Sequence, residues 1–240
     1  MEGNSRKPAF DLLIFDLDGT LADTRADLAA AVNSMRRHFD LPELTVAQVT
    51  GMVGEGLEKL LERALPGAGE QERARARALF HQFYSRNLVH HTRLYPGIRE
   101  VLEQTEGIDR AVLSNKPDAY TRTIVQRLGV APYFRLVMGK RDDFPRKPDP
   151  TSLRYILNQL NCPAERALII GDTKNDILAG QAAGVKTCAV TFGFRTAEQL
   201  KSYRPDYLIH SPLALLHIVF PAGAIRSNPS GGFFDLPEGD

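Results

Sequence analysis

The chain has 240 residues, of which 43% are hydrophobic and 25% charged, and this ordinary balance excludes a disordered chain, a collagen-like chain and a disulfide scaffold. Its 30 basic and 29 acidic residues give a formal net charge of +1, so it lacks the basic field that would hold a nucleic-acid backbone. The length suits one core with a smaller inserted or appended unit.

The amino-terminal segment is polar. Residues 1–8 lack the apolar core of a signal peptide, and nowhere does the chain run through about 18 consecutive apolar residues. Only two cysteines occur, Cys162 and Cys188, and Cys188 lies inside an apolar run, which favours reduced thiols over a disulfide. We therefore expect a cytoplasmic protein whose main partner is neither a membrane nor a nucleic acid.

Short apolar runs recur along the chain with the length and β-branched content of buried parallel strands. Five are well defined: Leu12–Phe15, Ala111–Ser114, Leu136–Gly139, Ala167–Gly171 and Val185–Thr191. A sixth and weaker run is Tyr207–Ile209, and amphipathic segments of helix length separate the later runs: residues 118–128, 149–160 and 175–183. Strands that alternate with helices predict an α/β fold, with a Rossmann-like parallel sheet core covered on both faces.

The first and second apolar runs are separated by far more residues than one crossover helix needs. The intervening segment, residues 23–90, is rich in Ala, Leu, Glu and Arg and has no strand pattern. Several of its leucines show helical spacing: Leu57, Leu60, Leu61 and Leu65. We therefore expect an inserted all-helical cap domain, with hinges near residues 21–24 and 94–97.

This division gives the expected domain boundaries. The α/β core domain combines residues 1–22 with residues 95–220, and the helical cap domain spans residues 23–94. Residues 221–240 are rich in Gly, Pro and Ser and end in acidic side chains, so we expect a flexible carboxyl-terminal tail.

Acidic residues follow two of the expected strands. Asp16 and Asp18 come directly after the first strand, and Asp172 and Asp176 follow the fourth. Carboxylates gathered at neighbouring strand ends repel one another, which a bound cation or a raised pKa would relieve, and hard oxygen ligands suit Mg²⁺. Each motif has a purely structural alternative: the first could be a turn, and Asp172 or Thr173 could cap a helix.

Two further positions suit a phosphate group. Ser114 and Asn115 end the second strand with a hydroxyl and an amide ahead of a helix, and Lys147 precedes Pro148 with a positive charge. Taken singly, Ser114 could be a strand-end cap and Lys147 a solvated surface charge. Their order along the chain, together with the acidic motifs, favours a phosphate site.

The chain resembles the haloacid dehalogenase superfamily, whose four motifs match, in order, Asp16-Leu17-Asp18-Gly19-Thr20, Ser114-Asn115, Lys147, and Gly171-Asp172 with Asp176. The match covers the core from Leu12 to Thr191, and the helical insert resembles the cap that closes over small substrates. Three segments look most like phosphoglycolate phosphatases: Lys116-Pro117, residues 91–97 and residues 54–56.

The resemblance implies a mechanism for hydrolysis of a small phosphate monoester, with 2-phosphoglycolate as the expected substrate. It makes Asp16 the nucleophile that forms an aspartyl-phosphate, and Asp18 the general acid and base. It places Mg²⁺ on Asp16, the backbone carbonyl of Asp18, and Asp172. It assigns phosphate binding to three residues, Ser114, Asn115 and Lys147, and a supporting role to three others, Asp176, Gly19 and Thr20.

Several alternatives stay open. A pyrophosphatase, a phosphosugar phosphatase or a mutase of the same superfamily would share every core residue, and a non-catalytic binding module could keep the fold. Asp18 argues against a dehalogenase, and Lys59, the only cap lysine, is expected to be solvated, which argues against a Schiff-base phosphonate hydrolase. Residues 51–56 could face the substrate or merely join two helices. A monomer and a homodimer are equally compatible.

Overall fold

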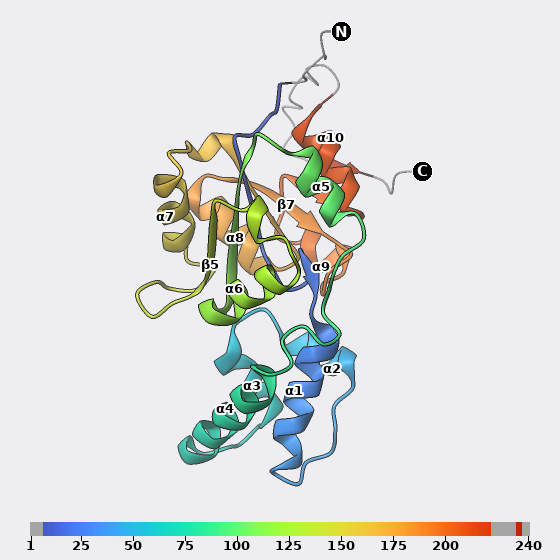
Figure 1. Ribbon diagram of the computed structural model, residues 1–240, viewed down its shortest axis with the longest axis vertical. Helices are drawn as coiled ribbons and strands as arrows, with labels where there is room; N and C mark the ends of the chain where they lie inside the picture. Colours follow the sequence, from blue (N-terminus) through green and yellow to red (C-terminus); the bar gives the residue numbers. More distant parts are fainter. Residues whose placement is uncertain (1–6, 222–233, 237–240) are drawn as a thin grey trace.

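The computed structural model describes residues 7–221 and 234–236. Its core is a parallel sheet of seven strands in the order β5-β4-β1-β6-β7-β8-β9 (Figure 1). The strands are β1 (Leu12–Phe15), β4 (Asp109–Pro117), β5 (Leu136–Lys140), β6 (Ala167–Gly171), β7 (Lys186–Val190), β8 (Tyr207–Ile209) and β9 (Phe234–Leu236). All six expected strands are present, and the predicted α/β fold is confirmed.

Alternate residues of β1 face opposite sides of the sheet, as the two-residue period of a strand requires. Leu13 and Phe15 belong to one apolar cluster and Leu12 and Ile14 to another, and all four are fully buried. The helices that cover the sheet are α5 (Ile98–Gln104), α6 (Asp118–Arg127), α7 (Thr151–Gln159), α8 (Lys174–Ala183), α9 (Ala197–Lys201) and α10 (Leu215–Val219). Within residues 7–221, three single 3₁₀ turns complete the core: Ala131–Tyr133, Ala164–Arg166 and Pro212–Ala214.

The insert is helical, as expected, and lies beyond the carboxyl ends of the strands (Figure 1). Its helices are α1 (Arg25–Arg37), α2 (Val46–Met52), α3 (Leu57–Ala64) and α4 (Glu70–Tyr84). Thr45 and Gln48 form a capping box that begins α2, and α3 buries Leu60, Leu61 and Ala64 on one face, which is the spacing of an amphipathic helix. The domain boundaries at residues 23 and 94 stay a prediction.

The two connections between insert and core run side by side. β2 (Ala22–Asp23) pairs antiparallel with β3 (Arg93–Leu94), close to both expected hinges. The buried carboxylate of Asp27, at the start of α1, accepts backbone N–H groups of residues 90–92 at 2.8 to 3.0 Å and the Thr92 hydroxyl at 2.7 Å. A carboxylate so fully bonded ties the outgoing chain to the returning chain.

The expected end of the second strand was wrong. We expected the strand to stop at Ser114, whereas β4 continues to Pro117 with an irregular register between Leu113 and Pro117. A bulge of this kind re-aims the side chains of a strand without ending its pairing. Ser114, Asn115 and Lys116 are therefore held in the sheet rather than in a loop ahead of α6.

Three further expectations concern the thiols, the membrane and the tail. Both cysteines are free thiols, and Cys188 is buried in β7. Across residues 7–221 and 234–236, no helix combines the length and apolar character needed to cross a bilayer. Within the tail expected to be flexible, residues 234–236 form β9 beside β8; residues 222–233 and 237–240 lie outside the described part.

Candidate active site

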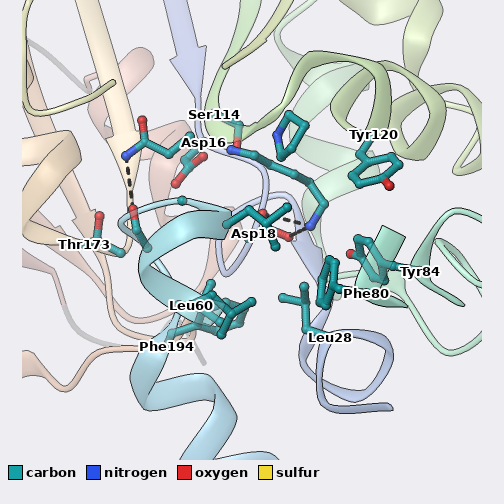
Figure 2. A pocket seen from close by; sticks show the side chains of 17 residues that line it. Asp16, Asp18, Leu28, Leu60, Phe80, Tyr84, Ser114, Tyr120, Thr173 and Phe194 are labelled. Atoms are coloured by element: carbon teal, nitrogen blue, oxygen red, sulfur yellow. Dashed lines mark hydrogen bonds and ion pairs between the residues drawn. The ribbon is translucent and has the colours of Figure 1, made fainter. Parts of the chain in front are cut away.

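A pocket lies where the carboxyl ends of β1, β4 and β6 meet the helical insert (Figure 2). Asp16 and Asp18 follow β1, Ser114 lies in the bulged end of β4, and Thr173 follows β6. The insert supplies the opposite wall, which is apolar except for Tyr84: Leu28, Val53, Leu57, Leu60 and Phe80 line the rest of it. The carboxyl edge of an open α/β sheet is where such folds bind ligands.

Three acidic side chains converge beneath this pocket. Asp16, Asp172 and Asp176 are buried, and one carboxylate oxygen from each lies within 4.8 Å of the others. Lys147 is buried beside them, with its Nζ 2.6 Å from Asp176 Oδ1 and 3.2 Å from Asp16 Oδ1. The structural alternative of a solvated Lys147 is therefore wrong. The turn after β1 and the helix cap at Thr173 are both present, and they coexist with the cluster of acidic side chains.

The cluster carries more negative charge than its single lysine offsets. Burial, which disfavours a charged carboxylate, raises the pKa of Asp16 to about 7, although Lys147 opposes the shift. Burial also raises the pKa of Asp172, and the neighbouring Asp16 and Asp176 raise it further. For Lys147, burial disfavours the ammonium, but the facing Asp16 and Asp176 outweigh it and raise the pKa.

The oxygen donors of the cluster fit a hard divalent cation. Asp172 Oδ2 accepts the Phe194 N–H at 2.7 Å, whereas Asp172 Oδ1 is buried and has no hydrogen-bond partner among the described residues. A buried carboxylate oxygen without a hydrogen-bond donor is unfavourable, and a cation bound between it and a neighbouring carboxylate would satisfy it. Carboxylate oxygens on a rigid sheet edge are the ligands that Mg²⁺ takes, so the residues present fit this metal.

Two glycines let the chain pass close to Asp172. Gly19 has φ +82°, and a Cβ there would overlap the Asp172 carboxylate; a Cβ on Gly193 would overlap the same side chain. Thr20 is fully buried, and its hydroxyl finds no partner in the described part of the chain. Gly19 thus supports the site by close approach, while no contact yet gives Thr20 a role.

Asp176 is a supporting residue in the observed geometry. Its Oδ1 pairs with Lys147, and its Oδ2 accepts the Thr173 N–H at 3.1 Å and the Thr173 hydroxyl at 2.7 Å. Asp176 also forms the capping box that begins α8. The helix cap and the acidic cluster therefore share one carboxylate.

Asp18 stands outside the three-carboxylate cluster and has its own partners. Its Oδ1 accepts the Thr24 hydroxyl at 2.6 Å, and Lys116 Nζ lies 2.9 Å from Oδ1 and 3.2 Å from Oδ2 (Figure 2). Lys116 is buried, and its ammonium lies 4.9 Å from the centre of the Tyr84 ring. We expected no catalytic or binding role for Lys116. Two signals in the sequence pointed to it: its position after Ser114-Asn115, and the resemblance of Lys116-Pro117 to phosphoglycolate phosphatases.

The amide of Asn115 is occupied by backbone groups. Its Nδ2 donates to the Lys147 carbonyl at 2.9 Å and to the Gly54 carbonyl at 3.1 Å, and its Oδ1 accepts the Lys147 N–H at 2.9 Å. Lys147 Nζ is similarly occupied by Asp16, Asp176 and the Leu113 carbonyl. In this conformation neither offers a spare donor, so phosphate contact by either stays a prediction.

Ser114 is placed differently. Its Oγ accepts the Lys116 N–H at 3.3 Å, which leaves the hydroxyl proton available to an acceptor in the pocket. Of the three residues expected to bind phosphate, Ser114 is the one whose donor is uncommitted within the described part of the chain.

The glycine loop of the insert faces the site. Gly54 and Gly56 line the pocket, and the Gly54 carbonyl accepts from Asn175 Nδ2 at 3.0 Å as well as from Asn115. Arg195 of the core donates to the Val53 carbonyl at 2.6 Å, and Arg146 donates to the Glu55 carbonyl at 2.8 Å. The core therefore holds this loop by its carbonyls.

The loop contacts predict a selective effect of Asn175→Asp. A carboxylate has the same shape but cannot donate to the Gly54 carbonyl, so we expect the insert to be held less firmly and kcat to fall by roughly 10-fold, about the value of one hydrogen bond. Steady-state kinetics measures this. Asn158→Asp, the same change at an exposed position of α7, should leave kcat unchanged. Equal kcat values for both variants would show that the contact does not matter.

Lys59 takes no part in the pocket. It is half exposed on α3 and pairs with Glu62 at 2.7 Å. The expected solvated position is confirmed, and no described contact brings this amine to the acidic cluster.

The chain belongs to the haloacid dehalogenase-like hydrolase family, whose model matches residues 13–190. The resemblance inferred from the four motifs is thereby confirmed.

Individual relatives carry names that are more specific than the family description. The chain is 36% identical over 218 residues to a phosphoglycolate phosphatase of Vibrio vulnificus, covering 87% of this chain and 95% of the relative. It is 35% identical over 214 residues to phosphoglycolate phosphatase 1 of Pseudomonas aeruginosa, covering 85% of this chain and 78% of the relative. A crystal structure of a predicted phosphoglycolate phosphatase from Haemophilus somnus matches with a TM-score of 0.83 at 29% identity, over 88% of this chain and 98% of that one.

Proposed function

We propose that this chain hydrolyses a small phosphate monoester, 2-phosphoglycolate, in a magnesium-dependent reaction through an aspartyl-phosphate on Asp16. The observation that carries the proposal is the environment of that carboxylate: it is buried, faces the pocket, and lies in a cluster with an orphaned oxygen on Asp172. The names of the relatives support the substrate. Residues 23–94 would form the cap domain over a core of residues 1–22 and 95–220.

The geometry of Asp16 distinguishes its two oxygens. Oδ1 accepts the Leu17 N–H at 2.7 Å and lies 3.2 Å from Lys147 Nζ, so Oδ2 is the oxygen left to attack phosphorus. As the bond from Oδ2 to phosphorus forms, the bond from phosphorus to the ester oxygen breaks. Asp16, Asp172 and the backbone carbonyl of Asp18 would hold Mg²⁺, which supplies positive charge between the carboxylate and the phosphoryl group.

Asp18 would move the protons of both half-reactions. Its carboxyl gives a proton to the leaving alkoxide, and the resulting carboxylate takes a proton from the water that then attacks phosphorus. That attack breaks the bond between phosphorus and Asp16 and restores the enzyme. The Thr24 hydroxyl, at 2.6 Å, fixes the orientation of the Asp18 carboxyl.

The phosphoryl oxygens need donors and positive charge. The uncommitted hydroxyl of Ser114 would donate to one of them, and Lys147 would contribute charge from beneath Asp16. Asn115 would act by fixing the backbone of Lys147 and the Gly54 loop.

Phosphate release tests the proposal. Purified protein would be given 2-phosphoglycolate, sugar phosphates, nucleotides and pyrophosphate, each with Mg²⁺ or with a chelator. We expect a magnesium-dependent preference for 2-phosphoglycolate. Turnover of pyrophosphate or a sugar phosphate instead would discard the substrate but keep the chemistry, whereas no release from any compound would favour a non-catalytic binding module.

Magnesium should also stabilise the fold, most strongly at high pH. Because burial raises the pKa of Asp16 to about 7 and also raises the pKa of Asp172, both carboxyls favour the folded state fully only below about pH 4. Asp16 loses that contribution as pH rises through about 7, and Asp172 loses its contribution as pH rises through its raised pKa. Mg²⁺ binds the ionised forms. At 100 times its dissociation constant it should raise Tm by about 5 to 10 °C at pH 8, and by less at pH 5.

Thermal unfolding with and without Mg²⁺ at the two pH values measures this effect. Asp172→Asn should lose most of the magnesium shift, and Asp11→Asn, at an exposed position, should keep it. An equal shift at pH 5 and pH 8, or a full shift in Asp172→Asn, would contradict the assignment of these ligands.

A further inference from the structure

Positive charge at the pocket wall comes from one residue, because Lys147 lies beneath Asp16 and does not line the pocket. Among the described residues that line the pocket, Lys116 is the only cationic side chain. The wall opposite the acidic residues is built from aliphatic and aromatic side chains of the insert, including Leu57, Leu60 and Phe80. A charged group on the leaving alcohol would be costly against that wall, because burial of an unpaired charge in an apolar environment is strongly unfavourable.

Lys116 has spare hydrogen-bonding capacity. An ammonium carries three N–H donors, and the contacts with the two oxygens of Asp18, at 2.9 and 3.2 Å, use at most two of them. The Asp18 side chain, 12% exposed, and the Lys116 side chain, 5% exposed, are both largely removed from water. The remaining donor therefore cannot rely on bulk solvent for a partner, and the protein group that faces it is the Tyr84 hydroxyl.

Tyr84 supplies a second uncommitted donor at the same place. Its side chain is 1% exposed and lines the pocket. The hydroxyl oxygen interacts with the Lys116 ammonium, but the O–H group has no acceptor in the described part of the chain. Burial raises the pKa of Tyr84 to about 12, so the hydroxyl keeps its proton and remains a donor at neutral pH. A buried O–H group without an acceptor is rare and calls for a ligand group that accepts from it.

We propose that Lys116 and Tyr84 together form a specificity site for a carboxylate on the leaving alcohol, so that the enzyme selects phosphate esters of short hydroxy acids over neutral esters of the same size. The inference rests on the proposed function and assigns its specificity to two residues. The carboxylate accepts from Lys116 Nζ and from the Tyr84 hydroxyl, while the ester oxygen stays near Asp18, which Lys116 also contacts. The short reach from Asp18 to Lys116 limits the acid to a small one.

Neutral esters would fail at this site for a physical reason. They leave the Tyr84 O–H group without an acceptor and give the Lys116 ammonium no anion besides Asp18. A site built to bond a polar group discriminates strongly against an analogue that lacks it. Sugar phosphates and nucleotides would in addition crowd the apolar wall.

The test compares 2-phosphoglycolate with ethyl phosphate, which lacks only the carboxylate, in the full-length protein with Mg²⁺. The measured quantity is the ratio of kcat/KM for the two esters. Lys116→Met should lower this ratio by about 100-fold, mainly by raising KM for 2-phosphoglycolate, because a buried charge pair loses one partner. Tyr84→Phe, which keeps the ring, should lower it by about 10-fold, in line with one hydrogen bond to a charged group.

Matched variants separate charge from folding. Lys59→Met removes a lysine from the exposed face of the insert and should leave the ratio unchanged. If Lys116→Met does not fold, the kcat/KM ratio of Tyr84→Phe alone tests the specificity site. An unchanged ratio in both Lys116→Met and Tyr84→Phe would overturn the specificity site and leave the phosphatase intact, as would a wild-type protein without preference. Failure of the wild-type protein to hydrolyse either ester would instead overturn the proposed function and the inference with it.

Discussion

Asp16→Asn should abolish hydrolysis, with kcat lowered by at least about 10⁴-fold, as is usual when a covalent nucleophile is removed. The amide has the shape of the carboxylate and can still accept the Leu17 N–H through its oxygen. It lacks the negative charge that attacks phosphorus. No neighbouring side chain can substitute, because Asp172 and Asp176 are held beneath the pocket by their own contacts.

The same substitution should not unfold the protein. Burial and two like charges oppose ionisation of Asp16, so its removal relieves repulsion in the cluster while Lys147 keeps its 2.6 Å pair with Asp176. We expect the metal-free Tm at pH 8 to stay equal or to rise. Loss of activity with an intact Tm would therefore report chemistry rather than folding.

Acid-quenched reactions with labelled substrate would test the covalent step directly. The wild-type protein should carry a label that is released by hydroxylamine, as expected of an acyl phosphate, and Asp16→Asn should carry none. Asp11→Asn, at the exposed start of the sheet, is the matched control and should hydrolyse substrate at the wild-type rate. Asp16→Asn activity above about 1% of wild type would exclude a covalent role.

The fold could be predicted from the sequence because the patterns that indicate its strands and helices are local. A buried parallel strand is a short apolar run, and β1, β6 and β8 lie where such runs were recognised. The helical insert was recognised from composition and leucine spacing, and α3 buries Leu60 and Leu61 of that pattern. The second strand was misjudged at its end because the bulge places polar side chains in a strand that remains paired with β5.

The partners within the site could not be read from the chain. Lys116 and Asp18 are 98 positions apart, and only the folded sheet brings their side chains to 2.9 Å. Asn115 was expected to face phosphate, but an amide bonds whatever lies nearest, and here that is the backbone of Lys147 and Gly54. The order of the motifs predicts which residues gather at the sheet edge. The tertiary structure decides which of their hydrogen-bond donors stay free to contact a ligand.

Asp18→Asn should separate the two half-reactions. An amide can neither give a proton to the leaving oxygen nor take one from water, so kcat for 2-phosphoglycolate should fall by about 10³-fold, within the usual range for a general acid-base group. The effect should depend on the leaving group. p-Nitrophenolate leaves without a proton, so formation of the aspartyl-phosphate from p-nitrophenyl phosphate should persist, and the apolar wall around Leu60 and Phe80 can accept an aromatic ring.

A burst measurement decides whether Asp18 has this role. With p-nitrophenyl phosphate, Asp18→Asn should release about one equivalent of p-nitrophenol and then slow down, because the phosphoenzyme forms but water attack lacks its base. Thr24→Val removes only the hydroxyl that orients Asp18 at 2.6 Å, so it should slow 2-phosphoglycolate hydrolysis modestly and affect phosphoenzyme formation from p-nitrophenyl phosphate less. If Asp18→Asn slows both esters equally and shows no burst, Asp18 acts by holding Lys116 in place, since that ion pair is the other contact the substitution breaks.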